Sequence, residues 1–334
     1  MDEYRGMPPS IAQESNRAPL SGVGRTVRRW FDAGDKPAVA AGVSWRDDPI
    51  DWARVLPFVL MHVVCLFIFV VGWSPIAIGV ALAAYWLRMF AITGFYHRYF
   101  SHRSFKTSRT AQFIFGVLGA SAVQRGPVWW AAHHRHHHAH SDRPEDPHSP
   151  LQHGFWRAHM GWFLTRKGFT PDLRRVRDLT QFAELRMLDR FDICVPVLLA
   201  VGMFGLGAFL ERAAPSLGTG SWQMLIWGFF VSTIACYHGT YTINSLSHVF
   251  GRKRYRTGDE SRNNWLLALL TLGEGWHNNH HHYPSAARQG FYWWEIDITY
   301  YVLKVLSWLG IIWDLKTVPL SVRDHSPRRI EPLT

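Results

Sequence analysis

The chain has 334 residues, a length that suits one large domain or two ordinary ones. Hydrophobic residues make up 48%, but they gather in a few long runs separated by basic, histidine-rich stretches, which is typical of a membrane protein. The mean hydropathy of -0.08 indicates a large water-facing part beside any membrane spans. The net charge of +11 favours anionic lipid head groups or a phosphate-bearing substrate over nucleic acid, because the basic residues flank the apolar runs.

Cysteine usage excludes two further classes of protein. Cys65, Cys194 and Cys236 each lie inside an apolar run, and no two of them have CxxC spacing. They are predicted to be small buried hydrophobes, so neither a disulfide framework nor a cysteine zinc site is expected.

Four apolar runs approach the roughly 20 residues that a helix needs to cross a bilayer. The predicted spans are residues 52–72, 76–93, 193–210 and 222–242. Residues 1–50 are polar and weakly patterned, and are predicted to be a flexible cytosolic tail, while residues 317–334 are predicted to be a C-terminal tail. Arg88 lies late in the second run, and an isolated arginine is costly in lipid, so that helix is predicted to leave the membrane there.

Lysine and arginine are concentrated in alternate connecting segments. The N-terminal tail, the block 97–190 and the segment after residue 250 are basic, whereas the two other loops are nearly free of both residues. By the positive-inside rule both termini and the histidine-rich blocks are predicted to be cytoplasmic, in a multi-pass protein of the inner membrane. The predicted fold is an all-α integral membrane protein with four transmembrane helices, carrying a cytosolic helical cap formed by residues 97–190 and 250–316.

Three histidine clusters lie on this predicted cytoplasmic side. Residues 133–140 read HHRHHHAH, residues 97–102 read HRYFSH, and residues 277–282 read HNNHHH. In a helix, the HxxHH spacing of the first and last clusters directs three imidazoles to one face. His97 and His102 are five apart, about 140° around an α-helix, so they suit either a helix end or two different metals.

These histidines, with His248 placed four residues after Asn244, give nine candidate ligands. That is too many for one metal ion and suitable for two. All-imidazole ligation suits iron or another transition metal, and spacing alone does not exclude zinc. Asp142, Glu145 and Asp146 are candidates for orienting ligand imidazoles, or for plain loop capping.

The motifs HRYFSH, WWAAHHRHHH, NSLSH and GEGWHNNHH now carry a specific resemblance. The chain resembles the integral-membrane fatty acyl desaturases of the stearoyl-CoA desaturase type, as a bacterial member, from about Asp51 to Lys316. The resemblance implies four transmembrane helices under a cytosolic cap, with two iron ions. The metal ligands that it implies are His97, His102, His134, His137, His138, His248, His277, His280 and His281, with Asn244 acting through a water.

The resemblance also implies substrate contacts. Offsets from the histidine motifs assign the bent acyl tunnel to Gln124, Trp130 and Thr240, and the phosphates of the acyl carrier to Arg166 and Lys167. The animal members have Arg-Asp just before the second histidine motif, where this chain has Ala132-His133.

The implied function is O2-dependent insertion of a cis double bond, at carbon 9, into a long-chain saturated fatty acyl-CoA. No haem or flavin motif is visible, so a separate electron donor of the ferredoxin, rubredoxin or cytochrome b5 type is expected. An acyl-lipid desaturase or a related membrane di-iron hydroxylase stays open as an alternative. A metal-ion transporter is less favoured, because transporters place ligands near the bilayer midplane and these lie at or beyond helix ends.

Overall fold

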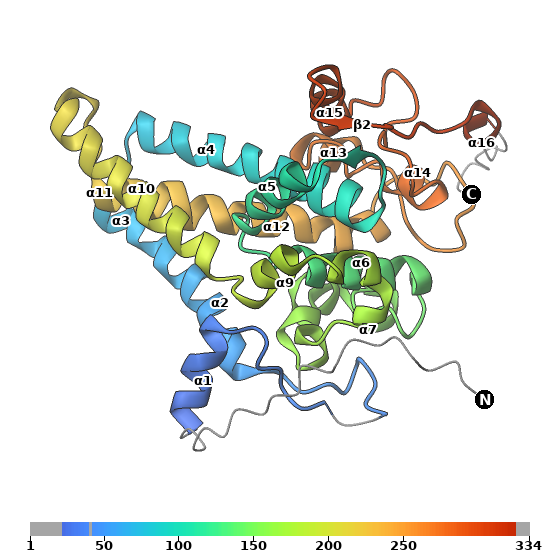
Figure 1. Ribbon diagram of the computed structural model, residues 1–334, viewed down its shortest axis with the longest axis horizontal. Helices are drawn as coiled ribbons and strands as arrows, with labels where there is room; N and C mark the ends of the chain where they lie inside the picture. Colours follow the sequence, from blue (N-terminus) through green and yellow to red (C-terminus); the bar gives the residue numbers. More distant parts are fainter. Residues whose placement is uncertain (1–21, 40–41, 325–334) are drawn as a thin grey trace.

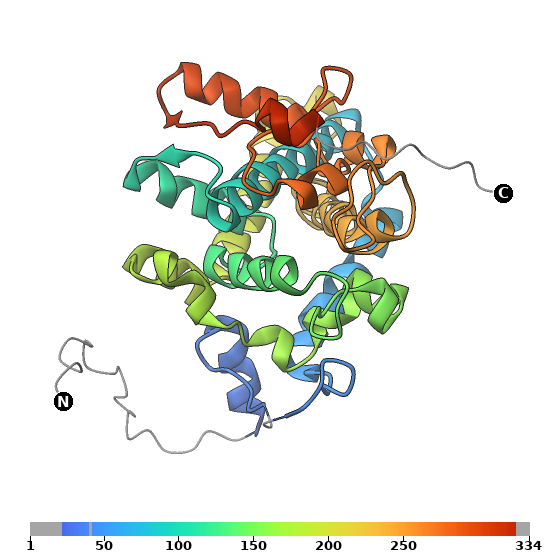
Figure 2. The ribbon, with the colours of Figure 1, turned by 90° about the vertical axis from the view of Figure 1, so that its right-hand side faces the viewer.

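The computed structural model describes residues 22–39 and 42–324, and these are mostly helical. Long helices extend to one side of the molecule, and a cap of shorter helices occupies the other (Figure 1). The described strands are two residues long, β1 (Lys106–Thr107) and β2 (Ile312–Trp313), and they pair antiparallel. Figure 2 shows the cap end on, with segments from the start, middle and end of the chain around one another.

Three of the described helices are long and apolar enough to cross a membrane. The first comprises α2 (Trp52–Val64), the 3₁₀ turn η1 (Cys65–Phe67) and α3 (Ile68–Val71), the second comprises α4 (Pro75–Phe90) and the π-helix η2 (Ala91–Ser101), and the third is α10 (Cys194–Ala213). The turn between α3 and α4 is as short as predicted. Gly72 at φ 66° closes it, and the Ser74 side chain caps α4 by accepting from the Ala77 amide at 3.0 Å.

The fourth predicted span falls in a continuous helical stretch. It comprises α11 (Ser221–Met224), the π-helix η8 (Leu225–Val231) and α12 (Ser232–Ser245). Its composition is more polar than that of the other three helices, so its crossing of the membrane stays a prediction. The polarity has a structural use, because Arg88 of α4 is 2% exposed and donates to Thr233 of α12 at 2.6 Å. Arg88 was predicted to be relieved by leaving the bilayer, whereas hydrogen bonds to α12 satisfy it inside the protein.

The cap consists of short elements on both sides of the last long helices. Its α-helices are α5 (Arg109–Ala120), α6 (Pro127–His140), α7 (Pro150–His153), α8 (Arg177–Thr180), α9 (Ala183–Arg190), α13 (Trp265–Leu270), α14 (His277–His282) and α15 (Ile298–Trp308). Single turns connect them: the π-helix η3 (Arg157–Gly161) and the 3₁₀ turns η4 (Trp162–Leu164), η5 (Lys167–Phe169), η6 (Leu173–Val176) and η9 (Leu246–His248). The 3₁₀ turn η7 (Pro215–Leu217) lies outside the cap, between α10 and α11.

An apolar core joins the cap to the second long helix. The rings of Phe95 on η2 and Phe115 on α5 stack at 3.9 Å. Gly119 of α5 lies against the ring of Tyr96, where a Cβ atom would come within 1.9 Å of the ring, so the two helices approach too closely for any larger residue. The short apolar run around residue 115 is therefore a buried helix of the cap, as its length suggests.

Two segments differ from the predicted flexible tails. Residues 22–31 form α1, which is fixed by ion pairing between Arg29 and Asp51 and by a hydrogen bond from the Trp30 indole to the Ala53 carbonyl. Residues 320–324 form α16 (Leu320–Asp324), whose Arg323 carbonyl accepts from the Tyr255 hydroxyl at 2.8 Å. Residues 1–21, 40–41 and 325–334 of the predicted tails lie outside the described residues.

Candidate metal centre

All nine histidines predicted as ligands come together, in two groups. The nitrogens of the first group lie within 4.8 Å of one another, and so do those of the second. The first group is His97, His102, His134, His138 and His280, and the second is His137, His248, His277 and His281. The sequence did not divide the histidines between two metals, and the structure does so.

Each HxxHH helix serves both groups. On α6, His134 and His138 are four residues apart and face the first group, while His137 between them turns to the second. On α14 the division is reversed, because His277 and His281 face the second group and His280 faces the first. Each of the two helices thus contributes ligands to both groups, which brings the two groups next to each other.

His97 and His102 converge because their segment is a π-helix. The His102 amide donates to the His97 carbonyl at 3.2 Å, a bond from residue i+5 to residue i, which is the π-helical pattern. Residues five apart then lie nearly above one another, and the two rings have centroids 4.9 Å apart. Both belong to the first group. Of the two alternatives that the α-helical angle left open, the structure has the helix end, and the two histidines are not divided between groups.

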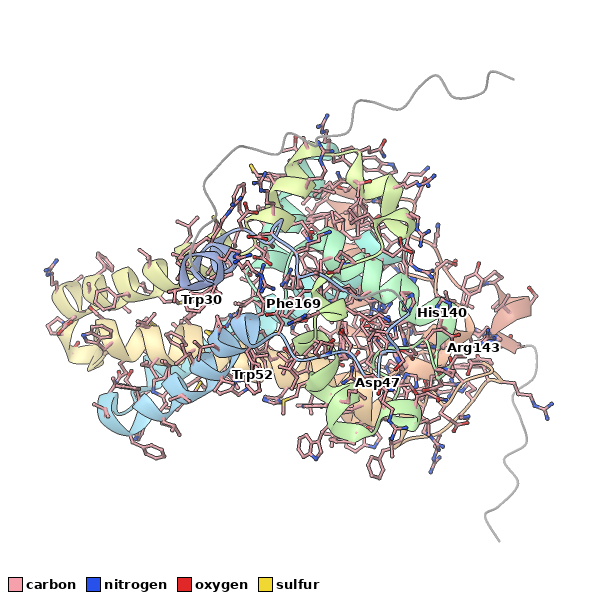
Figure 3. All side chains as sticks on the ribbon, turned by 90° about the horizontal axis from the view of Figure 1, so that it is seen from below. Trp30, Asp47, Trp52, His140, Arg143 and Phe169 are labelled. Atoms are coloured by element: carbon pink, nitrogen blue, oxygen red, sulfur yellow. The ribbon has the colours of Figure 1, made fainter. Side chains whose placement is uncertain are left out.

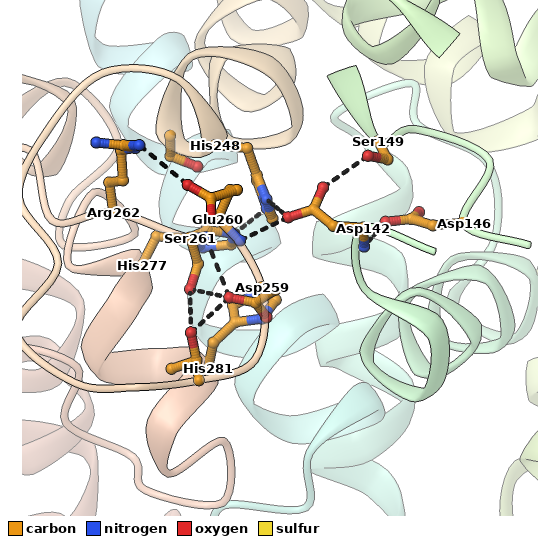
Figure 4. Close-up of polar contacts among 12 residues, drawn as sticks. Asp142, Asp146, Ser149, His248, Asp259, Glu260, Ser261, Arg262, His277 and His281 are labelled. Carbon is orange, nitrogen blue, oxygen red and sulfur yellow. Dashed lines mark hydrogen bonds and ion pairs between the residues drawn. The ribbon is translucent and has the colours of Figure 1, made fainter. Parts of the chain in front are cut away.

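Three carboxylates orient the second group from outside (Figure 4). Asp146 accepts from His137 Nδ1 at 2.9 Å, Asp142 from His248 Nδ1 at 2.9 Å, and Asp259 from His281 Nδ1 at 2.7 Å. Burial opposes the ionisation of Asp142, but hydrogen bonds from His248 and Ser149 lower its pKa to about 2. These carboxylates stay ionised and fix the ring tautomers.

The predictions for these acidic residues succeed in part. Asp142 and Asp146 contact histidines as suggested, whereas Glu145 offers only its backbone carbonyl, to His136 Nε2 at 2.8 Å. Sequence reasoning missed Asp259, which lies 22 residues before His281 with no spacing signal, and Glu274, which pairs with His97. Glu274 lies in the GEGWHNNHH motif, in a turn before α14, and its contact with His97 is not signalled by spacing.

The facing nitrogens fit a metal ion in each group. His137 and His281 both give their Nδ1–H to a carboxylate, so each neutral ring presents a lone pair on Nε2, and these two atoms are 3.3 Å apart. His97 and His280 face each other in the same way, with their Nε2 atoms 3.0 Å apart. Two facing lone pairs repel each other unless a cation or a proton lies between them.

Protons are disfavoured at most rings of this centre. Burial, reinforced by neighbouring imidazoles, holds the pKa of five of these rings well below the usual value: His102, His134, His138, His277 and His280. Burial also lowers the pKa of His281 to about 4, although Asp259 opposes this shift. Burial also opposes protonation of His137, but the charge and hydrogen bond of Asp146 outweigh it and raise the pKa of this ring. Neutral imidazoles are the form that binds transition metals, so the donor set suits two such ions.

A buried acid and a further histidine adjoin the second group. His137, Asp146 and His148 also have ligand atoms within 4.8 Å of one another. His148 is 5% exposed, and its Nδ1 lies 3.6 Å from Asp146. Because His137 already belongs to the second group, this cluster supports that group from one side.

Two cavities border the histidines. The larger has a volume of about 450 Å³, within the usual range for ligand pockets, and the three predicted tunnel residues line it together with His134 and Asn244. Gln124 donates to Thr240 Oγ1 at 2.9 Å, and the Trp130 ring stacks on His134 at 5.0 Å. The smaller cavity, of about 40 Å³, shares Trp130, Thr240 and Asn244 with the larger one and reaches histidines of both groups.

The predicted carrier-phosphate pair lies away from the large cavity. Arg166 is exposed, and neither it nor Lys167 lines the cavity. The Lys167 ammonium donates to the Val43 carbonyl at 2.9 Å and lies 4.6 Å from the centre of the Trp45 ring. The arginines that do line the cavity are Arg54 and Arg125, which sequence reasoning did not select.

Comparisons with known proteins agree with this arrangement. A family model described as fatty acid desaturase matches residues 71–305. The chain is 38% identical over 266 residues to the acyl-CoA 5-desaturase AL21 of Anemone leveillei, covering 78% of each chain. It is 36% identical over 270 residues to the sn-1 stearoyl-lipid 9-desaturase of Anabaena variabilis, covering 80% of this chain and 94% of the relative. It is 35% identical over 271 residues to the delta-9 acyl-lipid desaturase 1 of Arabidopsis thaliana, covering 80% and 84%.

The chain belongs to the membrane fatty acid desaturase family. It is an oxidoreductase that introduces a double bond into fatty acyl chains, and its two histidine groups are typical of the di-metal site of such enzymes.

Proposed function

We propose that this desaturase inserts a cis double bond at carbon 9 of a long-chain saturated acyl group, using O2, two iron ions and electrons from a separate donor protein. The observation that supports this most directly is the contact between the centre and the large cavity. His134 of the first group, Asn244 and the bonded pair Gln124–Thr240 all line that cavity. An acyl chain lying there would bring its methylene groups to the metal ligands.

The reaction requires more than acid–base groups, because an unactivated methylene has no acidic proton. Iron bound by the two histidine groups would supply activation of O2 and removal of hydrogen from carbon. In the balance, R–CH2–CH2–R′ and O2, with two electrons and two protons, give R–CH=CH–R′ and two water molecules. The imidazoles of the two histidine groups cannot supply electrons. A separate partner protein of the ferredoxin, rubredoxin or cytochrome b5 type is therefore proposed to supply the two electrons.

The chain's own side chains hold and orient the substrate. Aromatic rings dominate the wall of the large cavity near the centre, among them Trp129, Trp130 and Trp162. They exclude water and pack against methylenes. The Gln124–Thr240 hydrogen bond fixes two side chains from different elements at one point of the wall. A wall held in this way selects the carbon pair that meets the centre and favours a bent, cis product.

The orientation in the membrane is also proposed here. The basic segments flank the candidate spans on the side of the histidine groups, so the positive-inside rule assigns the centre and both termini to the cytoplasm. A reduced soluble donor protein would then reach the centre directly.

The test is product analysis on purified enzyme in lipid nanodiscs, loaded with ferrous iron and supplied with O2 and a reduced ferredoxin system. Stearoyl-CoA and a distearoyl phospholipid are offered in separate reactions, because the relatives named above include both acyl-CoA and acyl-lipid desaturases. The expected product is a cis-9 monoene, located by mass spectrometry and absent without O2. A hydroxylated product would instead support the hydroxylase alternative, and no product on either substrate would refute the proposal.

A further inference from the structure

The large cavity has an outer end between two helices that are candidates to cross the membrane. Its wall there is built from α2 and α10: Arg54, Pro57, Phe58 and Met61 on the first, and Ile193, Pro196, Val197 and Ala200 on the second. Val197 is 47% exposed, so the wall reaches the surface at this point. Because both helices are apolar enough to lie in lipid, this mouth opens towards the bilayer rather than towards water.

One arginine at the mouth has no acidic partner. Among the described residues the cavity is lined by two arginines, and Arg125 is paired with Asp192 at 3.0 Å. Arg54 lies 5.4 Å from the centre of the Phe169 ring, makes no ion pair with any described carboxylate, and has a buried Nε without a hydrogen-bond partner. A buried N–H donor without a partner is costly, and a ligand oxygen beside Arg54 Nε would complete it.

The helix beside the mouth has the composition of an interfacial helix. On α1, Val23, Val27 and Phe31 are exposed, and the same short helix contains Arg25 and Arg28. Exposed apolar residues together with arginines suit a helix lying at the level of lipid head groups. Trp30 of α1 lines the cavity, as do Arg54 and Phe169 (Figure 3 labels Trp30, Trp52 and Phe169). Head groups are therefore expected at the depth of Arg54.

The charge at the mouth does not match coenzyme A. That carrier has a pyrophosphate and a further phosphate, which need several cations in water-facing positions. Here one unpaired arginine faces the cavity, and the basic pair predicted for carrier phosphates is elsewhere: Lys167 is held by Val43 and Trp45, and Arg166 does not line the cavity. A single cation at the bilayer surface suits an ester carbonyl or one phosphodiester.

We propose that the substrate is the acyl chain of a membrane glycerolipid, which enters sideways between α2 and α10, and that Arg54 binds the ester carbonyl or the adjacent phosphodiester oxygen. This rests on the proposed desaturation. The apolar tail passes Pro57, Phe58 and Val197 to reach Gln124 and Thr240. Arg54 holds the polar end at the mouth, and the carbon presented to the centre is set by the length between them. Arg54 is thus a specificity-determining residue.

The first experiment compares three substrates with the same nanodisc preparation. The whole enzyme receives distearoyl phosphatidylcholine in the bilayer, distearoyl galactolipid in the bilayer, or stearoyl-CoA in solution. We expect the double bond to form first in the intact lipids. Desaturation of both lipids indicates recognition of the ester, and desaturation of phosphatidylcholine alone indicates the phosphodiester. Formation in stearoyl-CoA before either lipid would overturn the entry proposal while leaving desaturation intact, and no product anywhere would instead refute the proposed function.

The second experiment tests the mouth itself. Arg54→Gln is expected to lower kcat/KM for the lipid about tenfold or more, the usual effect of losing a hydrogen bond to a charged group, mainly through KM. Arg174→Gln is the matched charge control, because Arg174 is exposed and pairs only with Asp172. Val197→Trp should obstruct the mouth and slow the lipid reaction, while Leu198→Trp on the same helix should not, since Leu198 is 70% exposed and does not line the cavity.

A binding measurement separates entry from folding and catalysis. A phosphatidylcholine with a photoreactive diazirine in its stearoyl chain is placed in the nanodisc and incubated with the enzyme in the dark without O2. On irradiation with ultraviolet light it is expected to crosslink to peptides of α2 and α10. Val197→Trp should reduce that yield severalfold and Leu198→Trp should leave it unchanged. Equal crosslinking in both variants would overturn lateral entry. So would a loss of stearoyl-CoA turnover in Arg166→Gln accompanied by unchanged lipid kinetics in Arg54→Gln.

Discussion

The two histidine groups are built from the same helices but are supported differently. In the second group, Asp142, Asp146 and Asp259 each hold one imidazole through Nδ1. In the first group the described carboxylate contact is that of Glu274 with His97. Each group also has one buried Nδ1 without a hydrogen-bond partner, that of His280 in the first and that of His277 in the second. The first group therefore depends mainly on packing, and the second on charge.

The difference follows the surroundings of each group. His134 of the first group borders the large cavity and stacks with Trp130, so an apolar wall is needed on that side. The carboxylates that hold the second group, Asp142, Asp146 and Asp259, do not line the large cavity. Carboxylates near the acyl chain would bring water and charge into the cavity, whereas carboxylates behind the second group raise the basicity of its ligands. The contrast indicates that the carboxylates that hold metal-binding imidazoles lie mainly outside the large cavity, where the acyl chain is proposed to bind.

The largest effect is expected from removing one ligand of each group. His138→Ala and His281→Ala should each abolish desaturation, because each group needs its full set of imidazoles. Metal analysis by mass spectrometry should show at least one iron lost per chain in each variant. His140→Ala is the control, because its Nδ1 contacts only the His136 carbonyl at 3.0 Å. Activity retained in either ligand variant would break the assignment of that histidine.

Removing a supporting carboxylate should separate the groups. Asp259→Asn keeps the size of the side chain but removes the charge that holds His281. Loss of such a supporting carboxylate typically lowers metal affinity by about 10–100-fold. We expect one of the two irons to be removed by a competing chelator at lower concentration, while the other is unchanged. Glu260→Gln is the neighbouring control, since Glu260 pairs with Lys253 and Arg262 at the surface. Equal weakening of both irons would contradict the comparison.

Local rules predicted much of this centre and failed at identifiable places. The HxxHH spacings and the family resemblance together selected all nine histidines that meet, because ligands on one helical turn are readable from sequence. The convergence of His97 with His102 could not be predicted from the sequence, because the motif carries no signal for a π-helix. Asp259 was missed because its contact with His281 depends on how a long loop folds back, which is a tertiary effect.

The fold was predictable to a similar depth. Helix length and hydropathy located the three apolar helices within a few residues. The hydrogen-bond partners of Arg88 were not predicted, because the serine and threonine on α12 are remote in sequence. The site of the carrier was assigned by offset to Arg166 and Lys167, yet side-chain direction, rather than spacing, decides which cations reach a cavity.

A smaller effect is expected where the substrate wall is altered and no ligand is changed. Thr240→Val keeps the shape of the side chain but removes the acceptor of the Gln124 hydrogen bond, a loss of about 1 kcal/mol. Turnover should fall less than about tenfold, while part of the product should carry its double bond at a neighbouring position. Gas chromatography with mass spectrometry measures this ratio. Thr242→Val is the control, since Thr242 does not line the cavity and bonds the Gly239 carbonyl. A single product in Thr240→Val would show that the hydrogen bond does not set position.

The last expected effect is on stability rather than on the reaction, and it concerns a carboxylate that supports the metal helix without an imidazole. Asp189 accepts from the Trp129 amide in the first turn of α6 at 2.7 Å, and burial raises its pKa to about 6. Asp142 is kept ionised because the hydrogen bond from His248 lowers its pKa. Asp189 has no histidine partner, so burial raises its pKa instead.

This raised pKa fixes the sign of a pH effect. The folded chain binds the Asp189 proton more tightly than the unfolded chain does, so this contribution to stability is full below the unfolded pKa of about 4 and is lost as pH rises through 6. Asp189→Asn, which cannot ionise, should therefore gain on the natural chain between pH 5 and pH 7.5 by roughly 1.4 kcal/mol. Thermal unfolding midpoints in detergent at the two pH values measure it, with Asp172→Asn as an exposed control. Parallel midpoints for the two chains across this range would show that the buried acid near α6 is paired after all, and would weaken the contrast between supports with and without an imidazole.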